Sequence, residues 1–129
     1  MHASWQRLLE PVAPEIENIL AKIAHEDIAP PREEIFRAFD NDLEDVQVVI
    51  FGQDPYPTKG NAMGLAFSVP TNVTQIPASL RNIFQELKSD LGFGRPLSGD
   101  LTSWERSGVL LLNRVLTTRV GETAAHSDL

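Results

Sequence analysis

The feature that most constrains the fold is a short apolar segment with the composition of a buried β-strand. Val46 to Phe51 reads VQVVIF, is rich in β-branched residues and is followed directly by Gly52. An almost wholly apolar run of this length is typical of a strand covered on both faces in a parallel sheet. A similar run, Val109 to Leu112, follows Gly108, and a further strand is expected at Ala66 to Val69.

Amphipathic helices are predicted before and between these strands. After Pro14, apolar residues recur at the spacing of one helical face, at Ile16, Ile19, Leu20 and Ile23. LRNIFQELKSDL has the same periodicity, with Ser79 as a candidate N-cap and Gly92 at the expected end. After Pro31, REEIFRAF predicts a shorter helix. Strands that alternate with helices in this way indicate an α/β fold with a parallel sheet.

Composition and charge limit the possible classes of function. The 129 residues, 42% of them hydrophobic, suit one domain, and the absence of cysteine excludes disulfides and cysteine-ligated metals. No metal site is expected. No apolar run approaches the roughly 20 residues of a membrane helix, so we expect a cytoplasmic protein without membrane contact. The net charge of −7 argues against nucleic acid, but residues 46–129 hold 7 acidic and 7 basic side chains, so that region is neutral.

Candidate functional residues follow the first and last of these strands. In open parallel sheets, functional groups gather beyond the carboxyl ends of the strands, which here are followed by GQDPYP (52–57) and Asn113. Prolines 55 and 57 hold Asp54 and Tyr56 on a stiff, extended loop, which suits a positioned carboxylate. A lone Asp-Pro pair would more often be a simple turn, so the prediction depends on the whole motif.

GQDPYP, with the glycine-bearing loop and GLAFS that follow it, resembles the water-activating loop of the family-1 uracil-DNA glycosylases. IPASLRNIFQEL is similar to the family's Pro/Ser-rich loop and helix, and GDLTSWERSGVLLLNRVLTT to its third-strand region. The resemblance runs from about Pro30 to the last residue. It implies a three-layer α/β/α fold with a central, mostly parallel sheet, truncated after the third strand. Residues 1–129 would then be a single domain that is incomplete at its C-terminus.

The resemblance implies hydrolysis of the bond between uracil and deoxyribose in DNA, as in base-excision repair, without a metal or organic cofactor. Asp54 would activate the attacking water and stabilise the sugar cation. The Gln53 backbone amide would face uracil O2, although its side chain could simply be solvated. Tyr56 would occupy the space of the thymine methyl group, or alternatively only pack the loop.

Three further residues have implied roles in binding. Phe67 would stack on the flipped base, although by itself it reads as a core residue. Asn113 would read the uracil edge through its amide, although an asparagine after a strand is often only a turn residue. Ser79 would contact a DNA phosphate, a role that is compatible with an N-cap. His126 matches a family histidine other than the catalytic one, so a structural or surface role is expected.

Family members continue beyond the position of Leu129 with another strand and a His-Pro-Ser-Pro loop, whose histidine stabilises the uracil anion. The leading hypothesis, which rests on the matching motifs, is an active or once-active monomeric DNA-repair hydrolase that acts on uracil in single- or double-stranded DNA. The alternative is a catalytically impaired fragment that at most binds uracil or DNA weakly. An unrelated α/β nucleotide-binding protein lacks support, because no glycine-rich phosphate-binding pattern follows any strand.

Overall fold

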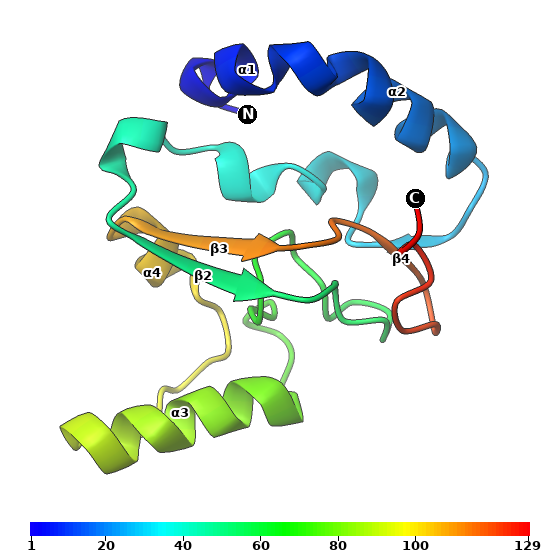
Figure 1. The fold of residues 1–129 in the computed structure, drawn as a ribbon. Helices are drawn as coiled ribbons and strands as arrows, with labels where there is room; N and C mark the ends of the chain where they lie inside the picture. Colours follow the sequence, from blue (N-terminus) through cyan, green and yellow to red (C-terminus); the bar gives the residue numbers. More distant parts are fainter.

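A computed structural model describes residues 1–129 and shows a small parallel sheet between two layers of helices (Figure 1). Strand β2, Val48–Gly52, pairs in parallel with β3, Val109–Asn113. The register places Val48 opposite Val109 and Gly52 opposite Asn113, so both strands end at the same edge. The two predicted strands and their parallel pairing are confirmed.

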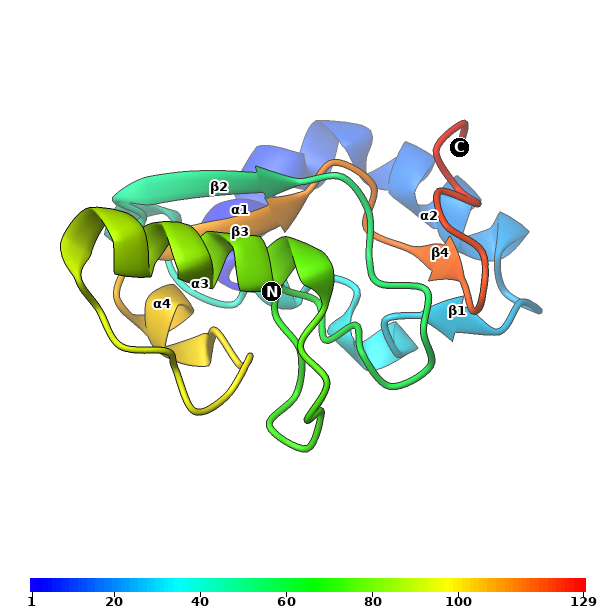
Figure 2. The same cartoon turned by 90° about the horizontal axis from the view of Figure 1, so that it is seen from below.

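Helices cover both faces of this sheet. Helices α1 (Ala3–Leu9) and α2 (Ala13–Lys22) lie on one side, and α3 (Ala78–Leu91) lies across the other (Figures 1 and 2). The three-layer α/β/α arrangement is therefore confirmed. Helix α3 ends as predicted at Gly92, whose φ of 72° is left-handed and is easily adopted by glycine. None of the helices combines the length and the apolar content needed to span a bilayer.

Several short elements connect the layers. Helix α4 (Thr102–Arg106) precedes β3, and an antiparallel pair joins β1 (Ile28–Ala29) to β4 (Thr118–Arg119). Short 3₁₀ turns complete the structure at η1 (Glu10–Val12), η2 (Arg32–Glu34), η3 (Arg37–Phe39) and η4 (Leu43–Asp45). Helices α1 and α4 were not predicted, because each is too short to show a clear periodicity.

Two predicted elements are wrong. Ala66 to Val69 is not a strand: the Ala66 N–H donates to the carbonyl of Leu111, but Phe67 has a φ of 67° and the chain turns away. REEIFRAF forms the turns η2 and η3 rather than one helix, since Phe36, at φ −105° and ψ 18°, interrupts the helical backbone.

Two finer expectations are also corrected. Ser79 is not the N-cap of α3, because the helix already begins at Ala78 after Pro77. Strand β2 is not covered on both faces: Val48, Val49 and Phe51 are 51%, 45% and 68% exposed. β3 is the only strand that pairs with β2, so the opposite edge of β2 has no neighbouring strand.

The main hydrophobic core lies around the sheet and the inner face of α3. Its buried members are Trp5, Ala38, Phe39, Leu65, Ala66, Val69, Leu80, Phe84, Leu101, Leu110 and Leu111. Leu80 comes from the first turn of α3 and is completely buried. This side chain anchors the start of α3, and with it Ser79, against the rest of the protein.

Replacing Leu80 by alanine should lower the free energy of unfolding by ~2–5 kcal/mol, because it removes a fully buried side chain and leaves a cavity. Urea unfolding followed by circular dichroism measures the change. Leu91→Ala is the matched control: Leu91 ends the same helix, is 59% exposed, and should change stability by at most ~0.5 kcal/mol. Equal losses in both variants would contradict this placement of the core.

Candidate active site

The GQDPYP loop and Asn113 lie side by side because β2 and β3 are parallel neighbours. Asn113 is the last residue of β3 and pairs in register with Gly52, where the loop begins. Backbone bonds continue beyond the strands: the N–H of Val115 donates to the Gln53 carbonyl (3.0 Å), and that of Gly121 to the Pro57 carbonyl (2.8 Å). The loop is thus attached along its length to the segment that follows β3.

One pocket of about 280 Å³ lies at this edge of the sheet. All six residues that the sequence predicted as a site line it: Gln53, Asp54, Tyr56, Phe67, Ser79 and Asn113. Sequence reasoning missed several apolar members of the wall and one residue from the C-terminal segment, Thr123. The structure therefore places the predicted residues around a common space, although they come from four separate segments of the chain.

Asp54 is partly exposed in this pocket and is held by a backbone group. Its Oδ2 accepts a hydrogen bond of 2.7 Å from the N–H of Ala124, which has a left-handed φ of 56°. No other protein donor reaches the carboxylate, and Asp54 takes part in none of the ion pairs. One oxygen is thus fixed, while Oδ1 remains available to a water molecule or substrate.

Tyr56 connects two other walls of the pocket. Its hydroxyl donates to the Phe67 carbonyl (2.9 Å) and shares a 2.9 Å hydrogen bond with Ser79 Oγ. Burial raises the pKa of Tyr56 above its ordinary value of 10.0, so the hydroxyl keeps its proton at neutral pH. The aromatic ring is therefore fixed in place by bonds at its outer end.

The backbone at Phe67 is strained, which is unusual for a bulky residue. Its φ of 67° lies in the left-handed region, where a non-glycine residue costs about 1–3 kcal/mol. The hydrogen bond from Tyr56 to the Phe67 carbonyl helps to hold this conformation. The strain turns the chain out of an extended path and places the Phe67 ring in the wall of the pocket.

Gly52 provides the space for the Asn113 amide. A Cβ at position 52 would lie 2.1 Å from Asn113 Oδ1 and 3.0 Å from the Ala66 Cβ. A side chain at residue 52 would therefore displace the amide. The sequence analysis used Gly52 only to mark the end of the strand, although a glycine in such a position can also indicate that another group approaches the backbone closely.

His126 does not line the pocket but is buried beside it, with 3% of its surface exposed. Its ring is hydrogen-bonded to Thr117 and to Glu26, which agrees with the structural role expected from the sequence. The Ala124 N–H and this buried histidine are the parts of the site that sequence reasoning did not connect to Asp54. A backbone N–H has no signature in a sequence.

Comparison with known proteins identifies relatives of this chain. Residues 39–128 match the family model described as the Uracil DNA glycosylase superfamily. The chain is 50% identical over 131 residues to uracil-DNA glycosylase 1 of Streptomyces coelicolor and 48% identical over 127 residues to uracil-DNA glycosylase of Mycobacteroides abscessus. The alignments cover 98% and 95% of this chain but 58% and 56% of those relatives, so it spans little more than half their length.

A solved structure agrees with the sequence matches. The crystal structure of mimivirus uracil-DNA glycosylase superposes with a TM-score of 0.90 at 30% identity, covering 98% of this chain and 51% of the viral one. The family model, the related sequences and the solved structure thus all indicate the same family. This chain belongs to the uracil-DNA glycosylase superfamily.

Proposed function

We propose that the chain excises uracil from DNA by hydrolysing the N-glycosidic bond between the base and deoxyribose. The observation that carries this proposal is the meeting of Asp54 and Asn113 at one pocket, from the ends of two neighbouring parallel strands. A carboxylate and a primary amide that line one pocket suit a reaction that must both recognise uracil and attack the sugar. The partner is uracil-containing DNA.

Recognition would use three walls of the pocket. The Asn113 amide donates to uracil O4 and accepts from N3–H, whereas cytosine presents the opposite pattern. Phe67 stacks on the base, and the ring of Tyr56 occupies the side on which thymine carries its methyl group. The Gln53 backbone amide faces O2, and the exposed Ser79 at the start of α3 meets a DNA phosphate.

Hydrolysis would proceed through a sugar cation. The bond between N1 and C1′ breaks, its electron pair leaves with the uracil anion, and the oxygen of a water molecule bonds to C1′. The Asp54 carboxylate, held at Oδ2 by the Ala124 N–H, orients this water through Oδ1 and accepts its proton. Its negative charge also stabilises the cation, because no basic group is paired with it.

One observation favours a second candidate, in which the chain binds uracil or DNA without efficient excision. None of the three histidines lines the pocket, so no imidazole there can stabilise the uracil anion. Losing one such electrostatic group commonly costs ~10²- to 10³-fold in rate. The two candidates therefore differ in the rate of base release and not in the shape of the pocket.

The test uses an end-labelled single-stranded oligonucleotide that carries one uracil, with strand scission by alkali after incubation with the 129-residue chain. Matched oligonucleotides carry cytosine or thymine at the same position. Scission at uracil alone supports excision. A gel-shift assay with the same uracil oligonucleotide measures binding, and binding without scission supports the binding-only candidate. A chain that neither binds nor cleaves the oligonucleotide would contradict both candidates.

Replacing Tyr56 by alanine should admit thymine to the pocket, since the excluded space would be empty. We expect the preference for uracil over thymine to fall by ~10- to 200-fold, the usual range for discrimination of a single methyl-sized group. The ratio of kcat/KM for the two oligonucleotides measures the change. Tyr56→Phe is the control, because it keeps the ring and loses the bonds to Phe67 and Ser79. Equal thymine release by both variants would mean that the hydroxyl, and not the ring, excludes the methyl group.

A further inference from the structure

The orientation of Asp54 depends on a turn near the C-terminal end of the described chain. The turn contains Gly121 and Ala124, both with left-handed φ values, of 83° and 56°. Its contact with the carboxylate is the single bond from the Ala124 N–H to Asp54 Oδ2. Any shift of the turn therefore rotates or releases the carboxylate, and with it the direction in which Oδ1 points.

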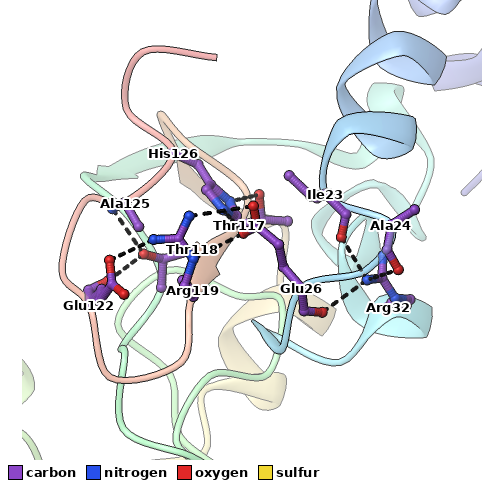
Figure 3. Close-up of polar contacts among 10 residues, drawn as sticks. All are labelled: Ile23, Ala24, Glu26, Arg32, Thr117, Thr118, Arg119, Glu122, Ala125 and His126. Atoms are coloured by element: carbon purple, nitrogen blue, oxygen red, sulfur yellow. Dashed lines mark hydrogen bonds and ion pairs between the residues drawn. The ribbon is translucent and has the colours of Figure 1, made fainter.

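On one side of Ala124 the turn is tied down by His126 (Figure 3). The imidazole is 3% exposed, its Nε2 lies 2.8 Å from Glu26 Oε2, and its Nδ1 lies 2.9 Å from Thr117 Oγ1. Because a carboxylate can only accept, Nε2 must carry the proton of this hydrogen bond. Both nitrogens of a buried ring are thus engaged, and the ring has one orientation.

On the other side of the turn, the Glu26 carboxylate that binds His126 also binds Arg119 (Figure 3). Arg119 Nε lies 3.3 Å from Glu26 Oε2, and its Nη1 donates to Glu122 Oε2 at 2.6 Å. The Thr118 hydroxyl donates to the Glu122 carbonyl (2.6 Å) and accepts from the Ala125 N–H (3.2 Å). These hydrogen bonds connect the two ends of the turn, residues 118–119 and 122–125, to each other.

Glu26 joins the two halves of this network, although it lies 100 positions before His126 in the chain. The hydrogen bonds from His126 and Arg119 lower the pKa of Glu26 below its ordinary value of 4.5, so it remains a carboxylate at neutral pH. The network has its charged centre outside the pocket, since neither Glu26 nor Arg119 lines it.

We propose that Glu26, through its bonds to His126 and Arg119, is a positioning residue that fixes the Ala124 N–H and so aims the Asp54 carboxylate. The inference rests on the proposed function for its kinetic consequence, but its structural part concerns only the bond between Ala124 and Asp54. The competing explanation is that the network merely fastens the C-terminal segment to the end of α2. In that case its loss would change stability and leave the Asp54 bond intact.

The test is Glu26→Gln in the full 129-residue chain, which keeps the size of the side chain and removes its charge. We expect kcat for uracil release to fall by ~10- to 100-fold with an unchanged KM, because a misaimed catalytic group slows chemistry without weakening binding. Hydrogen exchange of the Ala124 amide, followed by NMR, should accelerate. Amides of the β2–β3 ladder serve as the measure of global unfolding and should not change.

Two further variants calibrate the readouts. Asp27→Asn is the matched control: it removes one negative charge next to Glu26, and the Asp27 side chain is exposed and makes no hydrogen bond or ion pair. Asp54→Ala removes the acceptor itself and should accelerate exchange of the Ala124 amide in the same way. If Glu26→Gln fails to fold, Arg119→Gln decides instead: it removes the exposed charged partner of Glu26 (Nε to Oε2, 3.3 Å), keeps the buried bond from His126 to Glu26, and should likewise accelerate exchange of the Ala124 amide.

The outcomes separate the two proposals. Slower release together with faster Ala124 exchange, in Glu26→Gln but not in Asp27→Asn, supports the positioning role. An unchanged Ala124 amide overturns it, whatever happens to the rate. If no variant and not even the parent releases uracil, while Ala124 exchange responds as expected, the proposed function fails and the positioning of Asp54 stands.

Discussion

Asp54→Asn should lower kcat for uracil release by ~10²- to 10⁴-fold, the range expected when a positioned acid–base group is lost. Asparagine has the same shape, but it cannot accept the proton of the attacking water and carries no charge to stabilise a sugar cation. KM for the oligonucleotide should change little, because the groups proposed to read the base are untouched. Single-turnover assays on the uracil oligonucleotide measure both effects.

The fold should survive this substitution, since the only protein bond to the carboxylate comes from Ala124 and an amide oxygen can accept it. Asp128→Asn is the control for the change in net charge, because the Asp128 side chain is exposed and makes no hydrogen bond or ion pair. A rate for Asp54→Asn within about threefold of the parent would contradict the proposed role, because a lost acid–base group should cost far more.

Gly52→Ala should lower kcat/KM for the uracil oligonucleotide about as much as the loss of a residue that binds the base, although residue 52 contributes no side chain of its own. Its Cβ would lie 2.1 Å from Asn113 Oδ1, so the amide must leave the position from which it can read uracil. An unmade hydrogen bond to a buried partner costs ~1–3 kcal/mol, so kcat/KM for the uracil oligonucleotide should fall by ~10- to 100-fold. Inhibition by free uracil should weaken in proportion.

The alanine at position 52 should also lower stability by ~1–3 kcal/mol through overpacking against Ala66. Gly94→Ala is the matched control: an added Cβ there would meet no atom within 4 Å, and Gly94 is not left-handed. Normal uracil binding by Gly52→Ala would show that the Asn113 amide does not depend on this space. A thermal melt of each variant separates the loss of stability from the loss of recognition.

Local patterns predicted much of this fold. The periodicity of LRNIFQELKSDL gave α3 to within two residues at its start, and Gly92 marked its end. The apolar runs after residue 45 and after Gly108 became β2 and β3. Each of these signals depends on neighbours a few positions apart, which is why one sequence is sufficient to detect them.

Where prediction was wrong, a distant contact decided the backbone. GLAFS has the composition of a strand, but Phe67 takes a left-handed φ while Tyr56, 11 positions earlier, binds its carbonyl. The exposure of the β2 side chains likewise depends on the sheet, in which β2 has one neighbouring strand. Neither the bond from Tyr56 nor the number of neighbouring strands can be seen from the residue types of the segment itself.

The sequence by itself identified six residues of the candidate site and indicated that four of them, Gln53, Asp54, Tyr56 and Asn113, lie at the ends of two parallel strands. These properties reside in short motifs, because strand length, helical periodicity and the restriction imposed by proline act over a few residues. Only the tertiary structure decided how the groups are aimed. The bond from Ala124 to Asp54 spans 70 positions and the bond from His126 to Glu26 spans 100, and such contacts form only when the whole chain has folded.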